Sequence, residues 1–256
     1  MKILVRLPNW LGDMVMSVGF MNQLPHFFPG AEISVIAKKG IHELLSFFPE
    51  TQHQFVFSKE DFKGVKGLLK FGKQIKQREA FDLFFCLPDS FSSAVMGAAT
   101  GAKRRIGYKN ELRQVLLTDA YSKPDGMHRV DEYARLIELF TNKSLVPADV
   151  SLHHRFHKED YVVVNINSEA SSRRLTVAKA VELLNLLRSS VEQKIILIGA
   201  PKEKEFVDTV LKQLNNSSGI ESLAGKTSLL QLAEVLASAK LMLTTDSGPA
   251  HLANAL

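Results

Sequence analysis

The fold is decided by one stretch of the sequence, Lys240-Leu241-Met242-Leu243-Thr244-Thr245-Asp246-Ser247-Gly248-Pro249-Ala250-His251. The apolar run 241–243 predicts a buried strand, residues 246–248 predict a tight turn, and the residues after Pro249 predict the start of a helix. A helix that begins after a Ser/Gly turn presents free backbone N–H groups and the positive end of its dipole at one point. The stretch therefore predicts a site for a phosphate or a diphosphate at the end of a strand.

The same alternation of strand and helix runs through the whole chain. Short apolar runs rich in β-formers recur at 3–5, 33–36, 55–57, 83–85, 161–164, 195–198 and 241–243. Segments with helical periodicity lie between them, for example Val181-Leu184-Leu187 and Leu229-Leu232-Val235-Leu236. Nearly continuous apolar strands that alternate with helices indicate parallel sheets covered by helices on both faces.

The polar stretch 145–160 is the candidate domain boundary, since it lies between a long helical segment and a new strand. We predict an α/β protein of two Rossmann-like domains, 1–150 and 158–256, whose carboxyl strand edges face each other across a ligand cleft. The chain ends soon after the helix that follows Pro249 begins, so we expect the second domain to be incomplete.

Composition and motifs exclude several classes of protein. The chain is 45% hydrophobic and 23% charged, has one cysteine, Cys86, and has no apolar run of membrane-spanning length, which predicts a cytoplasmic protein. No Walker motif or G-x-G-x-x-G motif is present, so ATP hydrolysis and NAD chemistry are not expected. His153, His154 and His157 lack the Glu of a metalloprotease helix, and we predict no metal site.

The positive charge of the chain is concentrated in one segment. Residues 59–78 hold seven Lys or Arg and two acids, an excess of +5 that equals the net charge of the chain. Val65, Leu68, Leu69 and Ile75 alternate with the lysines at helical spacing, which predicts a basic amphipathic helix. Such a helix either lies on an anionic membrane surface or is a solvated surface helix. No nucleic-acid recognition motif accompanies it, so we expect no nucleic acid as a partner.

Polar side chains follow the first strand of each predicted domain. Asp13 closes the segment Pro8-Asn9-Trp10-Leu11-Gly12-Asp13, where a carboxylate acts either as a helix cap or as a general base toward an alcohol. Arg173 and Arg174 follow Ser168 in the loop after the strand 161–164. Paired guanidinium groups suit phosphate oxygens, whereas the alternative is a solvated loop that caps the next helix.

Two further residues occupy similar positions. Glu203 follows the strand 195–198, where a carboxylate either accepts hydrogen bonds from ribose hydroxyls or favours the dipole of the next helix. His251 lies in the first turn of the helix after the Ser/Gly turn, where it is either structural or completes the contact with an anion.

Three separated motifs, in the order that they have in one known family, carry a resemblance. Asp246-Ser247-Gly248-x-x-His251, preceded by Leu223-Ala224-Gly225-Lys226-Thr227-Ser228-Leu229, resembles the C-terminal signature of the ADP-heptose:lipopolysaccharide heptosyltransferases. Pro8-x-Trp10-x-Gly12-Asp13-x-x-Met16-Ser17 is similar to the type II members. So is Leu87-Pro88-Asp89-Ser90-Phe91-Ser92-Ser93-Ala94, followed by Arg105-Ile106-Gly107. The resemblance covers essentially the whole chain.

The resemblance implies a GT-B fold and an inverting, metal-independent transfer of L-glycero-D-manno-heptose from ADP-heptose to the inner core of lipopolysaccharide, with no cofactor. It implies that Asp13 is the base that takes the proton of the acceptor hydroxyl. The donor-binding residues that it implies are Ser168, Glu169, Arg173, Glu203, Thr227, Asp246, Ser247, Gly248 and His251. For the anionic acceptor we predict Arg104, Arg105, Arg113 and His128.

A monomer of a Gram-negative bacterium in peripheral contact with the cytoplasmic face of the inner membrane is the expected setting. Two alternatives stay open at this point. One is a truncated, catalytically inactive remnant that still binds a nucleotide sugar. The other is a related GT-B transferase that uses a different nucleotide sugar, because the choice of sugar depends on a pocket shape that sequence does not display.

Overall fold

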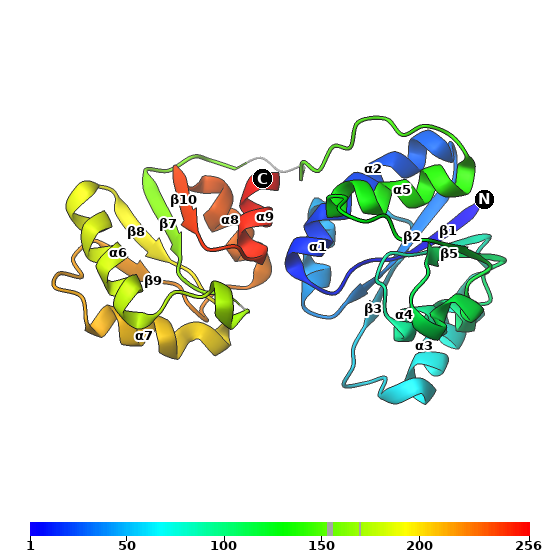
Figure 1. Cartoon of the computed structure of the whole chain (residues 1–256), viewed down its shortest axis with the longest axis horizontal. Helices are drawn as coiled ribbons and strands as arrows, with labels where there is room; N and C mark the ends of the chain where they lie inside the picture. The colour runs from blue at the N-terminus through cyan, green and yellow to red at the C-terminus, as the bar shows by residue number, and fades with distance from the viewer. Residues whose placement is uncertain (153–155, 169) are drawn as a thin grey trace. The chain divides into compact units, whose positions relative to one another are not determined.

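The structure is a computed structural model, and it describes residues 1–152, 156–168 and 170–256. The chain divides into two compact units, Met1–Leu152 and His153–Leu256 (Figure 1). Each unit holds one sheet of parallel strands, and the predicted α/β class is confirmed. His153, His154 and Glu169, which were named above, lie outside the described residues.

The first unit is built on a six-stranded parallel sheet of order β3-β2-β1-β4-β5-β6. Its strands are β1 (Lys2–Arg6), β2 (Glu32–Lys38), β3 (Gln54–Phe57), β4 (Leu83–Cys86), β5 (Arg104–Tyr108) and β6 (Asp119–Tyr121). Every residue of β4 is buried, as expected for a central strand that helices cover on both faces.

Helices cover the two faces of this sheet in pairs. The pair α2 (Val18–Phe27) and α5 (Arg129–Thr141) lies on one face, and the pair α3 (Gly64–Arg78) and α4 (Phe91–Thr100) lies on the other (Figure 1). The short helix α1 (Leu11–Met16) precedes α2, and two 3-10 helices, η1 (Ile41–Phe47) and η2 (Glu111–Leu116), follow β2 and β5.

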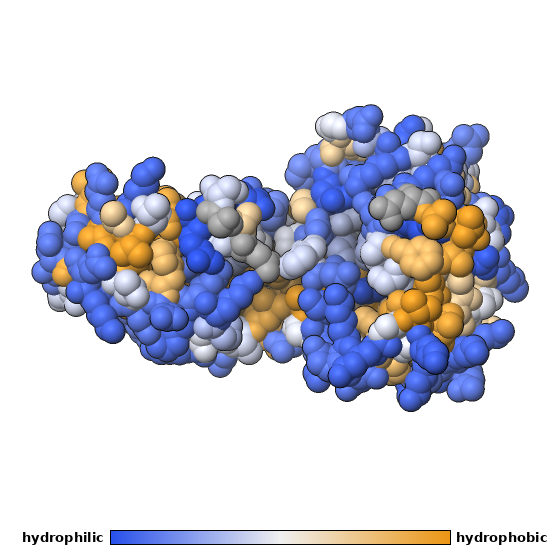
Figure 2. Space-filling view, turned by 60° about the horizontal axis from the view of Figure 1, so that its bottom comes forward, coloured by the Kyte–Doolittle hydropathy of each residue, from blue (hydrophilic) through white to orange (hydrophobic). Residues whose placement is uncertain are grey.

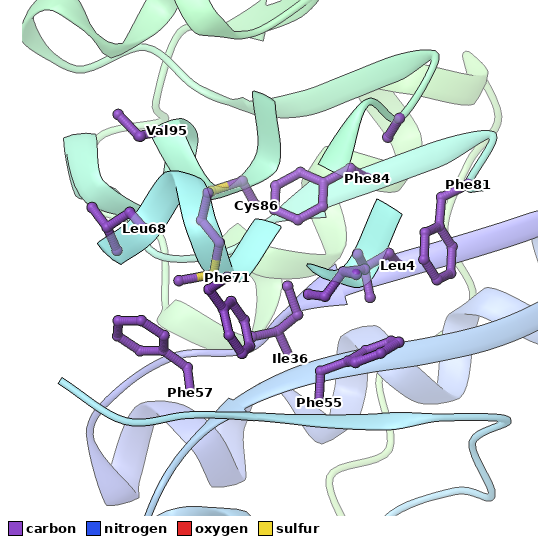
Figure 3. Close-up of a cluster of buried hydrophobic side chains, with 13 residues drawn as sticks. Leu4, Ile36, Phe55, Phe57, Leu68, Phe71, Phe81, Phe84, Cys86 and Val95 are labelled. Carbon is purple, nitrogen blue, oxygen red and sulfur yellow. The ribbon is translucent and has the colours of Figure 1, made fainter. Parts of the chain in front are cut away.

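Successive side chains of β4 point to opposite faces and fill two halves of the core. Phe84 belongs to the cluster of Leu4, Ile36 and Phe71 beside α3 (Figure 3). Phe85 contacts Phe20 on the other face, with ring centroids 5.2 Å apart. Helix α4 can lie close to the sheet because it carries glycine at position 97, where a Cβ atom would lie 2.3 Å from the Phe84 ring.

The second unit is built on a four-stranded parallel sheet of order β10-β7-β8-β9. Its strands are β7 (Tyr161–Asn165), β8 (Lys194–Leu197), β9 (Ile220–Ser222) and β10 (Leu241–Thr244). Its helices are α6 (Val177–Ser190), α7 (Lys204–Lys212), α8 (Leu229–Ser238) and α9 (Gly248–Ala255), with 3-10 turns η3 (Ser171–Arg173) and η4 (Pro201–Glu203). Helices α6 and α7 pack together over a core that includes Val162, Val164 and Leu197.

Both sheets reverse their strand order beside their first strand. In the first unit β1 lies between β2 and β4, and in the second unit β7 lies between β8 and β10. The loops that leave two such strands diverge to opposite faces and open a crevice at the carboxyl edge, where α/β sheets bind their ligands. The residues that follow β1, β4, β7 and β10 are therefore the place to look for a site.

The basic helix of the sequence is α3. Its apolar side packs into the core through Leu68, Phe71 and Ile75, while its lysines are exposed. Among the described residues, no helix is long and apolar enough to cross a bilayer.

Candidate functional site

The turn between β10 and α9 is held against the end of β7 by side-chain hydrogen bonds. Asn165, the last residue of β7, donates from Nδ2 to the Ser247 hydroxyl at 2.8 Å and to the Thr244 hydroxyl at 3.3 Å. The Ser168 hydroxyl donates to the backbone carbonyl of Asp246 at 3.2 Å. Because β7 and β10 are parallel neighbours, both loops leave the sheet at the same edge. The turn between β10 and α9 is therefore held by hydrogen bonds against the loop that follows β7.

The N-terminus of α9 has the geometry of an anion site. Ser247 is the N-cap residue, but its hydroxyl makes no cap hydrogen bond and instead donates to the Thr245 carbonyl at 3.1 Å. Pro249 has no N–H and Ala250 donates its N–H to the Ser247 carbonyl at 3.1 Å, so the first turn offers chiefly the Gly248 N–H. The dipole of the helix adds positive potential at the same point.

Arg173 brings a full positive charge to this turn. Its guanidinium forms an ion pair with the carboxylate of Asp246, and both side chains are about half exposed. The neighbouring Arg174 instead places its guanidinium 5.5 Å from the centre of the Phe206 ring. The structure therefore separates two arginines that sequence reasoning treated as a pair, and only Arg173 contacts the turn.

The remaining predicted donor residues lie on neighbouring elements. Glu203 is buried in η4, and its carboxylate accepts a hydrogen bond from the backbone N–H of Ala200 at 2.7 Å. Thr227 follows β9 and lines a hollow of about 660 Å³ together with Lys226. His251 is half-buried in α9. The structure thus clusters Ser168, Arg173, Asp246, Ser247 and Gly248, while roles for these three others stay predictions.

Asp13 lies beside a basic side chain in the first unit. Trp10 is the N-cap residue of α1, and Asp13 is the third residue of the helix. The Asp13 carboxylate lies 3.5 Å from Nε of Arg129, the first residue of α5. The carboxylate is therefore held at the carboxyl edge of the sheet by a cation, and the position of Asp13 is not that of an N-cap residue.

Arg129 and Lys123 extend this contact into a network of charges. Arg129 pairs with Glu132 and lies 3.7 Å from Asp89, measured from Nη1 to Oδ2. Lys123 places Nζ 2.6 Å from Asp89 Oδ2 and 3.1 Å from Glu132 Oε1. Sequence reasoning missed Lys123 and Arg129, because each follows a segment that it did not assign to a strand.

Buried groups hold this network in place. Arg6 ends β1, and its guanidinium donates to the side chain of Asn9 at 2.5 Å and to the Ile36 carbonyl at 3.2 Å. Burial lowers the pKa of Arg6 to about 10, so the group stays charged at neutral pH and anchors the loop before α1. Burial, and then the charge of Asp13, raises the pKa of Tyr133, whose ring lies under Arg129 at 5.6 Å.

The structure places two of the predicted acceptor residues at the other end of the sheet. Arg104 and Arg105 begin β5, whereas ligands of parallel sheets bind where strands end. Arg104 forms an ion pair with Asp119, and Arg105 donates to the carbonyls of Ala102 and Leu116. The geometry does not support an acceptor role for either side chain.

The other two predicted acceptor residues lie near the network but differ in access. The Arg113 side chain is fully buried and donates to the Pro88 carbonyl at 2.6 Å. It therefore supports the loop after β4 from within and is not available to a ligand. His128 is exposed at the N-cap of α5, next to Arg129.

Within the described parts of the chain, no group of three or more His, Cys, Asp and Glu side chains is arranged to hold a metal ion. What the described residues do provide is a helix N-terminus beside Arg173 on the second unit and, on the first, the Asp13 carboxylate beside Arg129.

Comparison with known proteins now identifies the family. Residues 68–256 match glycosyltransferase family 9 (heptosyltransferase). The chain belongs to this family. The matched segment includes Asp89 and Arg129 in the first unit and the whole turn between β10 and α9.

Individual members of family 9 resemble the chain over its full length. Lipopolysaccharide heptosyltransferase 2 of Salmonella typhimurium is 28% identical, and that of Escherichia coli is 26% identical. Each match covers 100% of this chain and 80% of the relative. The solved structure of Escherichia coli ADP-heptose lipopolysaccharide heptosyltransferase II superposes with a TM-score of 0.83 at 27% identity, covering 100% of this chain and 82% of that one. The predicted family resemblance is confirmed.

Asn165 lies in the polar segment after the strand 161–164, but sequence reasoning gave its side chain no role of its own. The signal that could have found it is a polar residue that ends an otherwise apolar strand. We expect Asn165→Ala to loosen the turn, because losing two hydrogen bonds to buried or half-buried partners costs about 1–3 kcal/mol. Backbone amides 245–250 should then exchange their hydrogens faster, as mass spectrometry can measure. Asn254→Ala, an exposed position in α9, is the control. Equal exchange in the two variants would contradict this role.

Proposed function

We propose that this chain transfers an L-glycero-D-manno-heptosyl group from ADP-heptose to the inner core of lipopolysaccharide. The observation that carries the proposal is the turn between β10 and α9, tied to β7 by Asn165 and Ser168 and paired with Arg173, in a member of family 9. A nucleoside diphosphate is the leaving group whose charge such a turn can hold.

The donor half of the proposal assigns the diphosphate to the second unit. The Gly248 N–H at the start of α9 and the Arg173 guanidinium would stabilise the negative charge that develops on ADP as the bond between the anomeric carbon and the phosphate oxygen breaks. The Arg173 side chain is exposed enough to exchange its pairing with Asp246 for a phosphate oxygen. Glu203, Thr227 and His251 complete the proposed donor site.

The acceptor half assigns the base to Asp13. Its carboxylate would take the proton from the acceptor hydroxyl as the oxygen attacks the anomeric carbon from the face opposite ADP, so that the configuration inverts. The Arg129 guanidinium lies 3.5 Å from this carboxylate and orients it.

The anionic groups of the acceptor need cations near Asp13. We assign this role to Lys123, Arg129 and His128, in place of Arg104, Arg105 and Arg113. Lys123 and Arg129 keep about a third of their side-chain surface exposed, and His128 is exposed beside them. Both cations are now paired with Asp89 and Glu132, so an acceptor phosphate would compete for charges that are already oriented.

Titration calorimetry of the full chain with ADP-heptose tests the proposal, with UDP-glucose as the competing nucleotide sugar. We expect selective binding of ADP-heptose, followed by ADP release when a lipopolysaccharide core acceptor is added. Arg173→Gln should weaken binding about tenfold, since a hydrogen bond to a charged group contributes about 1.5–3 kcal/mol. Arg174→Gln is the matched control, because its guanidinium lies on Phe206.

Two outcomes of this titration favour the alternatives. Preference for UDP-glucose favours a transferase of another sugar. Binding of neither sugar by a protein that melts cooperatively, or binding of ADP-heptose with no transfer to any core acceptor, favours an inactive remnant.

Asp13→Asn should lower the rate of transfer about 10²- to 10⁴-fold while ADP-heptose still binds. An amide cannot accept the proton, and general base catalysis contributes about 10²- to 10⁴-fold to a rate. The measurement is initial rate of ADP release alongside calorimetric donor affinity. Asp125→Asn, an exposed carboxylate in the loop before α5, serves as the control. An undiminished rate of transfer in Asp13→Asn would remove the base assignment.

Arg129→Gln should raise KM for the core acceptor about tenfold or more and leave donor affinity unchanged, because the lost group is a charged hydrogen-bond donor. Arg135→Gln on the same helix is the matched control, since its partner is Glu138 on the exposed side. If Arg129→Gln and Arg135→Gln show the same KM for the core acceptor, Arg129 does not bind the acceptor.

A further inference from the structure

Five exposed apolar side chains form a patch on the first unit. They are Val65 and Leu69 of α3, Phe91 of α4, and Leu112 and Val115 of η2, and we call them the apolar patch. Leu112 and Val115 are 73% and 74% exposed. Figure 2 shows apolar surface gathered on this unit, with hydrophilic surface around it.

The five side chains lie together because of how their helices pack. Residues three apart share a face of a 3-10 helix, so Leu112 and Val115 point the same way. Helix α4 packs between η2 and α3, and Gly72 of α3 lies against α4. Val65 and Leu69 lie on the flank of α3 nearest α4 by helical spacing, and Phe91 is the first residue of α4.

Folding of the unit does not explain the exposure of these side chains. Helix η2 has an inner side, where Arg113 is buried and Leu116 packs against the core cluster of the sheet. Leu112 and Val115 belong to its outer side. Contiguous apolar surface of this kind marks an interaction site on a soluble protein more often than it is neutral.

Positive charge borders the apolar patch. Lys66, Lys70 and Lys73 lie at helical spacing on the exposed side of α3, and Lys109 is exposed just before η2. Segment 59–78 carries seven basic and two acidic residues. Apolar side chains rimmed by lysines complement a surface that is apolar within and anionic at its headgroups.

The apolar patch is connected to the proposed acceptor site. Phe91 follows Asp89 by two residues, and the Asn110 side chain just before η2 donates to the Asp89 carbonyl at 3.1 Å. Asp89 in turn pairs with Lys123 and lies 3.7 Å from Arg129. A surface bound at the patch therefore lies beside the edge of the sheet that holds Asp13.

We propose that the apolar patch inserts into the headgroup region of an anionic phospholipid bilayer while Lys66, Lys70, Lys73 and Lys109 bind the phosphate groups. The surface then brings the acceptor edge of the first unit to an acceptor that is anchored in the same bilayer. Access to a membrane-anchored acceptor, as the purpose of this contact, rests on the proposed function, whereas the binding of lipid itself does not.

Co-sedimentation of the full chain with vesicles that contain no acceptor tests the proposal. The protein should bind vesicles of phosphatidylethanolamine with phosphatidylglycerol, bind pure phosphatidylcholine weakly, and lose affinity as salt is raised. The double variant L112S/V115S should lose about tenfold or more in affinity. L186S/L230S, two exposed leucines of the second unit, is the matched control.

The charge contribution is tested separately. K66Q/K70Q/K73Q should weaken binding to the anionic vesicles about a hundredfold, since each of the three basic residues near such a surface contributes about 1 kcal/mol. K143Q/K179Q/K212Q removes the same charge from exposed positions elsewhere and should have little effect. Melting curves followed by circular dichroism check that each variant stays folded.

A local probe identifies the part of the chain that meets the lipid. An environment-sensitive dye on Val115→Cys should shift its emission to the blue when anionic vesicles are added, and the same dye on Leu186→Cys should not. The native Cys86 is buried and does not compete for the dye.

Three results would overturn this proposal: no binding of the wild-type chain to anionic vesicles, equal loss in the patch and control variants, or self-association through the patch that L112S/V115S abolishes while lipid binding persists. Since no ADP-heptose is present, failure of the lipid proposal leaves the proposed function standing. Conversely, a chain that binds anionic vesicles but not ADP-heptose would support the lipid proposal and contradict the proposed function.

Discussion

Parallel pairing between strands far apart in the chain is the constraint on which both candidate sites depend. β1 pairs with β4, and β7 pairs with β10, so each first strand ends beside a strand that comes two helices later or more. This pairing carries the Asp246–Gly248 segment to Asn165 and carries Asp89 to the edge where Asp13 lies. Without it the motifs would be separate loops with no shared ligand.

The two sites use charge in different ways. On the second unit the positive potential comes from a helix N-terminus and one arginine, which suits an anion that arrives and leaves. On the first unit three carboxylates, Asp13, Asp89 and Glu132, are paired with the two accessible cations Lys123 and Arg129. The buried Arg6 and Arg113 hold the neighbouring loops through backbone carbonyls. The contact with Arg129 restricts the orientation of the Asp13 carboxylate.

Much of the fold could be predicted from periodicity, and the failures have physical causes. The seven apolar runs fall in strands, apart from Ile198, which lies just beyond the end of β8. The prediction that the run 241–243 is a buried strand is wrong in its burial: β10 lies at the edge of its sheet, and Leu241 and Leu243 are 59% and 38% exposed. β5, β6 and β9 were not predicted: β5 begins with two arginines, and β6 and β9 are three residues long. Missing β5 also hid the direction of Arg104 and Arg105, which turned out to begin the strand. Basic residues that begin a parallel strand lie at the amino edge of the sheet, opposite the edge where the candidate site is.

By itself the sequence determined the α/β class, the strand–turn–helix segment at 241–255 and the motifs that place the chain in its family, since all of these depend on neighbouring residues. Only the tertiary structure decided that Arg173 and not Arg174 meets the turn, that Arg113 is buried, and that Arg129 lies against Asp13. These contacts join residues from different strands and helices. Which residues meet depends on strand order and helix packing, and the local spacing of residues along the chain predicts neither.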